Sequence, residues 1–336
     1  MKRRILSILT ALALCLSLCP TWALAAEYVA SVEIDGVTTQ HSTLRDAWNR
    51  ATAEPNKEAA ITLLENVDAG DDELYVDETS DETLGPETSF KVTLHGGGYT
   101  VSNCGFIVTN FTNSSLTIDN CSFNNAGVRA SSGTTTLTNC TGNVVDVIAD
   151  GGTAKLTGCN FDAPTIMVST LGEYSGEATF TGCVFRDNAQ VRISGGTASF
   201  TGGEIDGGGY DAVSVEGGTA AFDGCTISSQ NDYAVSVEGG NAAFNSCTIN
   251  SGGNSFYAGG GTAEITDCTV TGGEYAVYVN GGDLTINSGT FQSTGGGTDF
   301  HAVGLFILSG TARLQGGTFS GATSAIGSFG GCSLAG

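Results

Sequence analysis

The chain has 336 residues, of which 35 are acidic and 12 are basic, and its formal net charge is −23 at pH 7. This excess of negative charge argues against nucleic acid and anionic membrane surfaces as partners. It favours solubility in an extracellular setting.

Residues 1–26 are typical of a secretory signal peptide. Lys2, Arg3 and Arg4 form a basic start, residues 5–18 are apolar, and the Ala-Leu-Ala sequence at residues 23–25 fits the small-residue cleavage pattern. The apolar stretch is too short for a comfortable membrane span. Its removal leaves 9 basic residues against the 35 acidic ones, a net charge near −26. We therefore expect a secreted protein, extracellular or at the cell surface, with no transmembrane segment in the mature chain.

Residues 27–90 do not follow the pattern of the rest of the chain, and we expect them to form a small α+β capping module with an acidic loop. Residues 28–37 predict a hairpin that turns at Asp35 and Gly36. Residues 42–51 predict a helix that begins at Ser42 or Thr43. Its apolar stripe consists of Leu44, Ala47, Trp48 and Ala51. A strand follows at residues 60–64, and the module would cover the open end of an apolar interior.

Residues 68–87 are strongly acidic and are interpreted as a solvated loop. Extracellular Ca²⁺ binding is the functional alternative, but the spacing of the acidic residues does not match an EF-hand loop. The glycine run at residues 96–98 after His95 looks like an esterase oxyanion motif, but no nucleophile elbow accompanies it. We interpret it as a turn.

From residue 91 onward, a unit of about 20 residues recurs. In the unit at residues 233–249, three short runs separated by turn residues alternate with a period of two: Val235 and Val237 with Ser236, Ala242 and Phe244 with Ala243, and Cys247 and Ile249 with Thr248. Such alternation predicts strands that bury one face. One short unit cannot bury that face alone, but stacked units can.

The predicted fold is an all-β, right-handed parallel β-helix of about ten coils over residues 91–336. On this repeat pattern the chain resembles the right-handed parallel β-helix proteins of the pectate-lyase-like superfamily, whose best-known activity is polysaccharide cleavage. The N-terminal module resembles the one that starts many secreted bacterial β-helices. The sequence stops inside a coil pattern without a capping helix, which leaves a fragment or an end-to-end contact with another subunit as alternatives.

Two columns of the repeat should point inward. The first consists of Cys121, Cys140, Cys159, Cys183, Cys225, Cys247 and Cys268, with glycine in its place at Gly203, Gly289 and Gly317. The second, two residues later, consists of Phe123, Phe161, Phe185, Ile205, Ile227, Ile249, Val270, Phe291 and Phe319. Cysteines spaced along a line do not converge on a metal, and their parallel side chains suit disulfides badly. We interpret them as small buried hydrophobic residues.

One outward column ends in three successive aromatic residues. It consists of Arg192, Ser214, Ser236, Tyr257, Tyr278 and Phe306. The rings could stabilise the sheet by stacking, or they could form a platform for sugar rings. A longer unit at residues 293–300 could also fold over them.

The charged residues of the repeat argue against a catalytic site. The basic ones are few, namely Arg129, Lys155, Arg186, Arg192 and Arg313. Asp206, Asp211, Glu216, Asp232 and Glu238 are expected to be dispersed among turns, and none of the superfamily's usual catalytic motifs is present. The sequence favours a non-catalytic, adhesin-like protein, with no catalytic or metal site, that binds a polysaccharide or a host or cell surface. A polysaccharide lyase or glycoside hydrolase is the alternative, and a structural spacer is the third reading.

Overall fold

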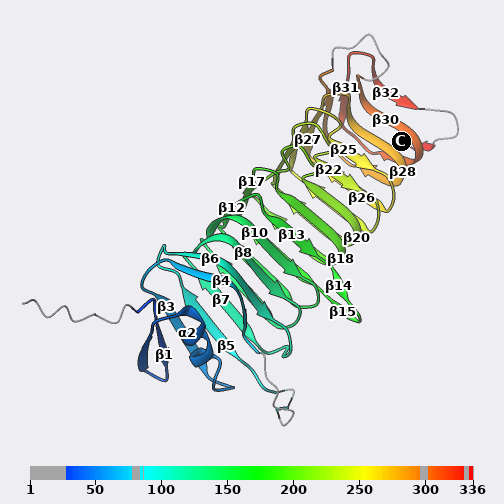
Figure 1. Ribbon diagram of the computed structural model, residues 1–336. Coiled ribbons are helices and arrows are strands. Elements are labelled where there is room, and N and C mark those ends of the chain that lie inside the picture. Colours follow the sequence, from blue (N-terminus) through cyan, green and yellow to red (C-terminus); the bar gives the residue numbers. More distant parts are fainter. Residues whose placement is uncertain (1–27, 78–83, 86, 296–301, 329–332, 336) are drawn as a thin grey trace, which may run out of the picture.

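The computed structural model describes residues 28–77, 84–85, 87–295, 302–328 and 333–335. The segment predicted to be a signal peptide lies outside these residues. The described chain is 64% strand and 3% helix, and it forms an elongated β-solenoid of about 11 turns (Figure 1). The predicted all-β, parallel β-helix fold is confirmed.

Each turn of the solenoid contributes to three parallel sheets. Four strands belong only to the first sheet: β13 (Thr165–Val168), β22 (Val235–Val237), β25 (Phe256–Ala258) and β32 (Ser324–Ser328). Nine belong only to the second: β3 (Glu58–Leu63), β5 (Lys91–His95), β7 (Ser115–Asp119), β9 (Thr134–Thr138), β11 (Thr153–Thr157), β16 (Glu177–Thr181), β23 (Asn241–Asn245), β26 (Thr262–Thr266) and β33 (Ser333–Ala335). Eight belong only to the third: β12 (Asn160–Asp162), β17 (Val184–Arg186), β19 (Glu204–Asp206), β21 (Thr226–Ser229), β24 (Thr248–Ser251), β27 (Cys268–Gly272), β29 (Gly289–Ser293) and β31 (Thr318–Ser320).

Longer strands bend from one sheet into the next. Four of them run from the third sheet into the first: β4 (Val67–Tyr75), β6 (Thr100–Val108), β8 (Ser122–Ala130) and β10 (Thr141–Ala149). Four others run from the first into the second: β18 (Gln190–Thr201), β20 (Val213–Asp223), β28 (Tyr275–Ile286) and β30 (Val303–Leu314). Because β3 and β4 already pair with the strands of the next turn, the stack begins earlier than the sequence indicated and has about 11 turns instead of ten.

The N-terminal module contains the predicted hairpin and helix. Strands β1 (Ala30–Ile34) and β2 (Val37–His41) are antiparallel and turn at Asp35 and Gly36, which both have positive φ. Helix α2 (Leu44–Ala51) is capped by the side chain of Thr43 and buries the predicted apolar stripe. Trp48 packs against Phe106 with ring centroids 5.3 Å apart, so the helix covers the first turns of the solenoid.

The interpretation of residues 68–87 as a solvated loop is wrong for its first part. Strand β4 extends through Tyr75 and pairs in parallel with β6, with an irregularity between Asp68 and Asp72. Asp77 is buried, and its carboxylate accepts hydrogen bonds from the backbone N–H groups of Thr109, Asn110 and Phe111. This acidic side chain therefore has a structural role. Residues 78–83 and 86 lie outside the described part.

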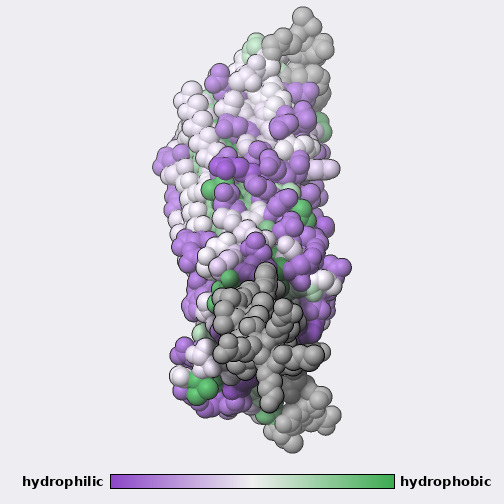
Figure 2. Space-filling view, turned by 60° about the vertical axis from the view of Figure 1, so that its left-hand side comes forward, coloured by the Kyte–Doolittle hydropathy of each residue, from purple (hydrophilic) through white to green (hydrophobic). Residues whose placement is uncertain are grey.

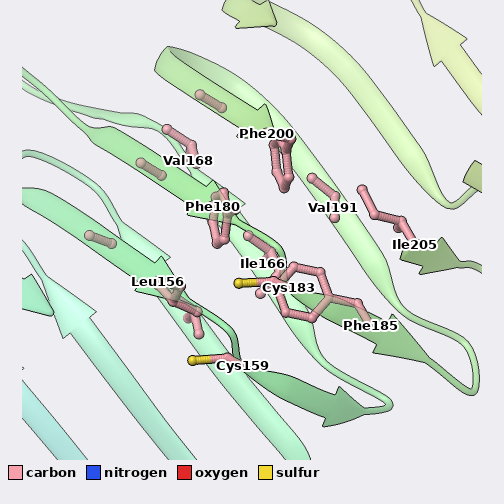
Figure 3. Close-up of a cluster of buried hydrophobic side chains, with 14 of the residues drawn as sticks. Leu156, Cys159, Ile166, Val168, Phe180, Cys183, Phe185, Val191, Phe200 and Ile205 are labelled. Carbon is pink, nitrogen blue, oxygen red and sulfur yellow. The ribbon is translucent and has the colours of Figure 1, made fainter. Parts of the chain in front are cut away.

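The interior is filled by the two inward columns of the repeat. Phe161 and Phe185 stack with ring centroids 6.0 Å apart. Figure 3 shows the side chains of Cys159, Cys183 and Phe185 in the same interior. All seven cysteines of the column are buried and none is joined in a disulfide, and the same holds for Cys104. Phe319 is only partly buried, near the end of the stack.

The residue before each column cysteine has positive φ, between 48° and 66°. The set consists of Asn120, Asn139, Gly158, Gly182, Gly224, Ser246 and Asp267. Gly and Asn adopt this conformation most easily, so the bend between the second and third sheets explains their recurrence. At Asp267 the carboxylate accepts a hydrogen bond from Ser288 Oγ, which also accepts from the Asp267 backbone N–H.

Within the described residues, α2 is the one helix, and it is far too short to cross a membrane. Figure 2 shows one side of the rod, where hydrophilic side chains are interspersed with a few isolated hydrophobic ones.

Candidate functional site

The outward column predicted from the repeat is in register in the first sheet. Arg192, Ser214, Ser236, Tyr257, Tyr278 and Phe306 are consecutive partners across β18, β20, β22, β25, β28 and β30. The structure therefore places the three candidate glycan-binding residues one above another on successive turns. Ser236 differs from the expectation because it is buried, with 1% of its surface exposed.

Two further tyrosines join these three rings. Tyr233 stacks on Tyr257 with centroids 4.8 Å apart, and Tyr275 stacks on Phe306 at 4.9 Å. Tyr278 contacts the rings of Tyr257, Tyr275 and Phe306 at 5.4–5.8 Å. We call these five residues the aromatic row: Tyr233, Tyr257, Tyr275, Tyr278 and Phe306.

The sequence did not indicate Tyr233 and Tyr275 as members of this row. Both lie at or beside the bend before a strand of the first sheet, where alternation does not set the direction of a side chain. The signal that could have found them is the recurrence of Tyr-Ala-Val at residues 233–235 and 275–277, on turns that carry the column. The same position holds Asp211 on the turn of β20.

The rings of the aromatic row are partly accessible. Tyr233, Tyr257, Tyr278 and Phe306 are half-buried, whereas Tyr275 is 8% exposed. Burial raises the pKa of Tyr233, Tyr275 and Tyr278, so their hydroxyl groups remain protonated at neutral pH. These hydroxyls can both donate and accept hydrogen bonds. Of the longer unit at residues 293–300, the part from residue 296 lies outside the described residues.

Polar groups hold one edge of the row in place. The amide of Asn280 donates from Nδ2 to the hydroxyl of Tyr257 at 3.4 Å, and its Oδ1 accepts from Ser309 Oγ at 3.0 Å. This chain of hydrogen bonds runs across successive turns beside the rings. Such orientation lowers the conformational entropy that a ligand would otherwise have to remove.

A cavity of about 300 Å³ lies on the same sheet, beside the turns that precede the aromatic row. We call it the polar cavity, and it is lined by Gln190, Val191, Arg192, Tyr210, Asp211, Ser214, Glu216 and Asp232. Arg192 pairs with Glu216, Nη2 to Oε2, at 2.6 Å. The ring of Tyr210 is 57% exposed on its wall. The expectation that the acidic residues are dispersed is therefore wrong for Asp211, Glu216 and Asp232. Asp211 and Asp232 lie at the bends of neighbouring turns and Glu216 lies on β20, and all three line the same cavity.

Asp211 has a perturbed carboxyl group. Its desolvation, the negative charge of Asp232 and a side-chain hydrogen bond with Asp232 raise its pKa to about 6. Glu238 adds a weaker effect in the same direction. Two carboxyl groups in contact cannot both ionise easily, so the pair holds a proton at mildly acidic pH.

The described residues contain no group of three or more His, Cys, Asp or Glu side chains arranged to hold a metal ion. In the acidic stretch, Asp72 pairs with Arg45 and Asp68 accepts from Asn103. A larger cavity of about 610 Å³ lies at the N-terminal module, between the start of α2 and β4. It lies beside the capping module and is lined by different residues from the aromatic row.

No protein-family model matches the chain. No curated protein sequence matches it either. Among solved structures, the chain is similar to the crystal structure of bacteriophage CBA120 tailspike protein 3 (TSP3, orf212), with 11% sequence identity and a TM-score of 0.28. The alignment covers 96% of this chain and 67% of the tailspike chain. That likeness is loose, and it is the chain's own parallel strand register that identifies it as a β-helix protein.

Proposed function

We propose that this is a secreted or cell-surface β-helix protein that binds a glycan, without cleaving it, along the aromatic row. The observation that carries the proposal is the register of Tyr257, Tyr278 and Phe306 on successive turns. Successive turns are about 4.8 Å apart, which is close to the length of one pyranose along an extended glycan. Half-buried aromatic faces present an apolar surface to sugar rings, while the hydroxyl groups of the tyrosines remain available for hydrogen bonds.

Charge favours an uncharged partner. The chain carries 35 acidic residues against 12 basic ones, so an anionic polymer would be repelled over the whole surface. A neutral glycan avoids this repulsion, and the Asn280 amide beside the rings can exchange hydrogen bonds with its hydroxyl groups.

A second candidate, glycoside hydrolysis, is favoured by the carboxyl groups of the polar cavity, since a raised carboxyl pKa is typical of a general acid. Its geometry is unfavourable at the perturbed pair. Asp211 and Asp232 both accept the backbone N–H of Tyr233, each at 3.1 Å, so the pair converges on a donor of the chain itself. The catalytic carboxyls of glycosidases instead stand about 5 Å or more apart and flank the bond that is cleaved. Binding without cleavage is therefore the function that we put forward.

The proposal is tested by retention of the mature protein on neutral polysaccharides in native affinity electrophoresis, with cellulose derivatives, xylan, mannan and starch as the panel. We expect retention on at least one, and loss of that retention in Tyr278→Ala. Tyr28→Ala is the matched control, because Tyr28 is 40% exposed in the N-terminal module. Absence of retention on every member of the panel, or equal loss in both variants, would overturn the proposal.

A further inference from the structure

The aromatic row and the polar cavity meet at Tyr233. The backbone N–H of this residue donates to Oδ1 of Asp211 and to Oδ1 of Asp232, each at 3.1 Å. Its side chain begins the aromatic row by stacking on Tyr257. The residues that form the wall of the cavity therefore also fix the first ring of the row, and the two features are parts of one surface.

The two features occupy successive turns of the solenoid. Arg192 and Ser214 of the polar cavity belong to the turns of β18 and β20, and Tyr233 belongs to the next turn. Tyr257, Tyr278 and Phe306 follow on the turns of β25, β28 and β30. Six turns at about 4.8 Å each give a straight surface with space for about six sugar units.

The lining of the polar cavity combines donors and acceptors. Arg192, Gln190 and Ser214 offer donors, while Asp211, Asp232 and Glu216 offer acceptors. A simple ion is bound by groups of the opposite charge, whereas each sugar hydroxyl group both donates and accepts hydrogen bonds. The volume of about 300 Å³ corresponds to about ten water molecules at ~30 Å³ each, so a pyranose with its hydroxyl groups fits. The exposed ring of Tyr210 supplies an apolar wall.

We propose that the polar cavity and the aromatic row form one groove for an uncharged glycan of about six units, in which the cavity recognises hydroxyl groups and the row stacks on sugar rings. This inference rests on the proposed function and extends it to the length and charge of the ligand. The excess of carboxyl groups over the one guanidinium in the cavity opposes uronic acids and other anionic sugars.

The perturbed carboxyl of Asp211 supports this assignment. Holding it beside Asp232 in a half-buried place opposes its ionisation. Residues kept in such an unfavourable state are concentrated at functional sites. A carboxyl group that shares a proton at mildly acidic pH can also act as donor or acceptor toward a hydroxyl group.

The inference is tested by the dependence of affinity on ligand length. Calorimetric titrations would use oligomers of two to eight units prepared from the polysaccharide that the protein retains. We expect Kd to fall at least tenfold between three and six units and then to level off. In the double variant Tyr210→Ala with Arg192→Gln, binding of trimers should be unchanged, and the affinity should already level off at about four units. Both side chains are exposed, so this variant should fold.

Controls separate the two proposals. Glu177→Gln, an exposed carboxylate of the second sheet, should reproduce the parent curve. Tyr278→Ala should weaken binding at every length. A parent curve that levels off at three or four units, or a double variant that follows the parent, would refute the joint groove while leaving binding at the aromatic row intact. Failure of every oligomer to bind would instead refute the proposed function.

The preference for an uncharged ligand is tested by comparing a neutral oligomer with an anionic one. A neutral hexamer of hexose units is compared with the same hexamer oxidised to uronic acid at C6. We expect at least tenfold weaker binding of the oxidised hexamer by the parent, and a smaller difference in Asp211→Asn. Equal binding of both hexamers would show that the ligand need not be uncharged.

Discussion

The carbonyl oxygen of Cys183 occupies the space that a Cβ atom at Gly203 would need. Gly203 stands in the cysteine column, at the position where most turns carry a cysteine, and its φ is +89°. The backbone of one turn therefore passes directly over the next at this point, and a side chain cannot be placed between them. Glycine interrupts the column here for a steric reason.

Gly203→Ala should consequently lower stability by about 2–4 kcal/mol, since it adds a clash with backbone to the strain of positive φ. Gly224→Ala is the matched control, because Gly224 has φ of +66° but a Cβ atom there would meet nothing within 4 Å beyond its chain neighbours. The control should cost about 1–2 kcal/mol. Denaturant unfolding of both variants measures the difference, and equal losses would contradict the steric account.

The column cysteines should be unreactive in the native protein. They are buried, and burial opposes the charged thiolate form at each of them. It raises the pKa of Cys121 in the column, and that of the neighbouring Cys104 to about 12. Thiolate, the reactive form, is therefore scarce at pH 8. Labelling with a thiol reagent should be slow in buffer and complete after denaturation. Rapid native modification of most of these cysteines would contradict the inward direction of the column.

Asp211 should make stability depend on pH. Its pKa of about 6 in the folded protein lies above the usual value of about 3.9, so the folded state binds the proton more tightly. Stability is then greatest below about pH 4 for this group and declines as pH rises through 6. The full shift would correspond to about 3 kcal/mol, but half-exposure reduces the expected effect to about 1 kcal/mol.

Asp211→Asn separates this effect from other carboxyl groups. Asn retains an acceptor for the Tyr233 N–H and removes the charge. The variant should melt at a higher temperature than the parent at pH 7.5 and at nearly the same temperature at pH 4.5. A constant difference between the two proteins across this range would exclude titration of Asp211 as the cause.

Tyr278 has both a structural and a ligand-binding role in the proposed groove. Its ring contacts three others and is half-buried, so Tyr278→Ala should cost about 1–2 kcal/mol from lost ring contacts. Tyr278→Phe should retain that stability because the ring remains. Thermal melting of both variants tests this, and a loss of 3 kcal/mol or more in Tyr278→Ala would indicate a ring that belongs to a closed core.

The protein should not cleave pectate, polygalacturonate or the neutral polysaccharide that it retains. Asp211 and Asp232 both accept the Tyr233 N–H instead of flanking a position for a glycosidic bond. Product release is followed by reducing-end and unsaturation assays over prolonged incubation. Sustained release that disappears in Asp211→Asn and in Glu216→Gln would overturn binding without cleavage.

The repeat made the fold predictable because strand alternation and a nearly constant unit length constrain every turn in the same way. The constant unit length also sets the strand register, so the sequence alone aligns the column from Arg192 to Phe306 as the strand pairing does. Strand β4 was not predicted because its acidic residues mask the apolar alternation. Its buried large apolar residues are Val67 at its start and Leu74 near its end, followed by Val76 just beyond it, and the stretch between Val67 and Leu74 has none.

The site was less predictable than the fold. Side chains at bends are directed by local backbone geometry, which a period-two pattern does not describe. Tyr233, Asp211 and Asp232 all precede strands of the first sheet, and their meeting depends on how neighbouring bends overlap. Tyr210 lies on the cavity wall for the same reason, because a bend sets the direction of its side chain.

The hairpin of β14 (Thr170–Leu171) and β15 (Tyr174–Ser175) interrupts one turn without disturbing its neighbours. Leu171 and Tyr174 are 49% and 65% exposed at its tip. The flanking strands keep their partners in the turns before and after, so the chain leaves the solenoid and re-enters it in register. Lengthening a loop at this position adds little to the entropic cost of closing it. The corner between the first and second sheets at this turn is thus a natural graft point, where foreign peptides can be displayed on a rigid rod without rebuilding its interior.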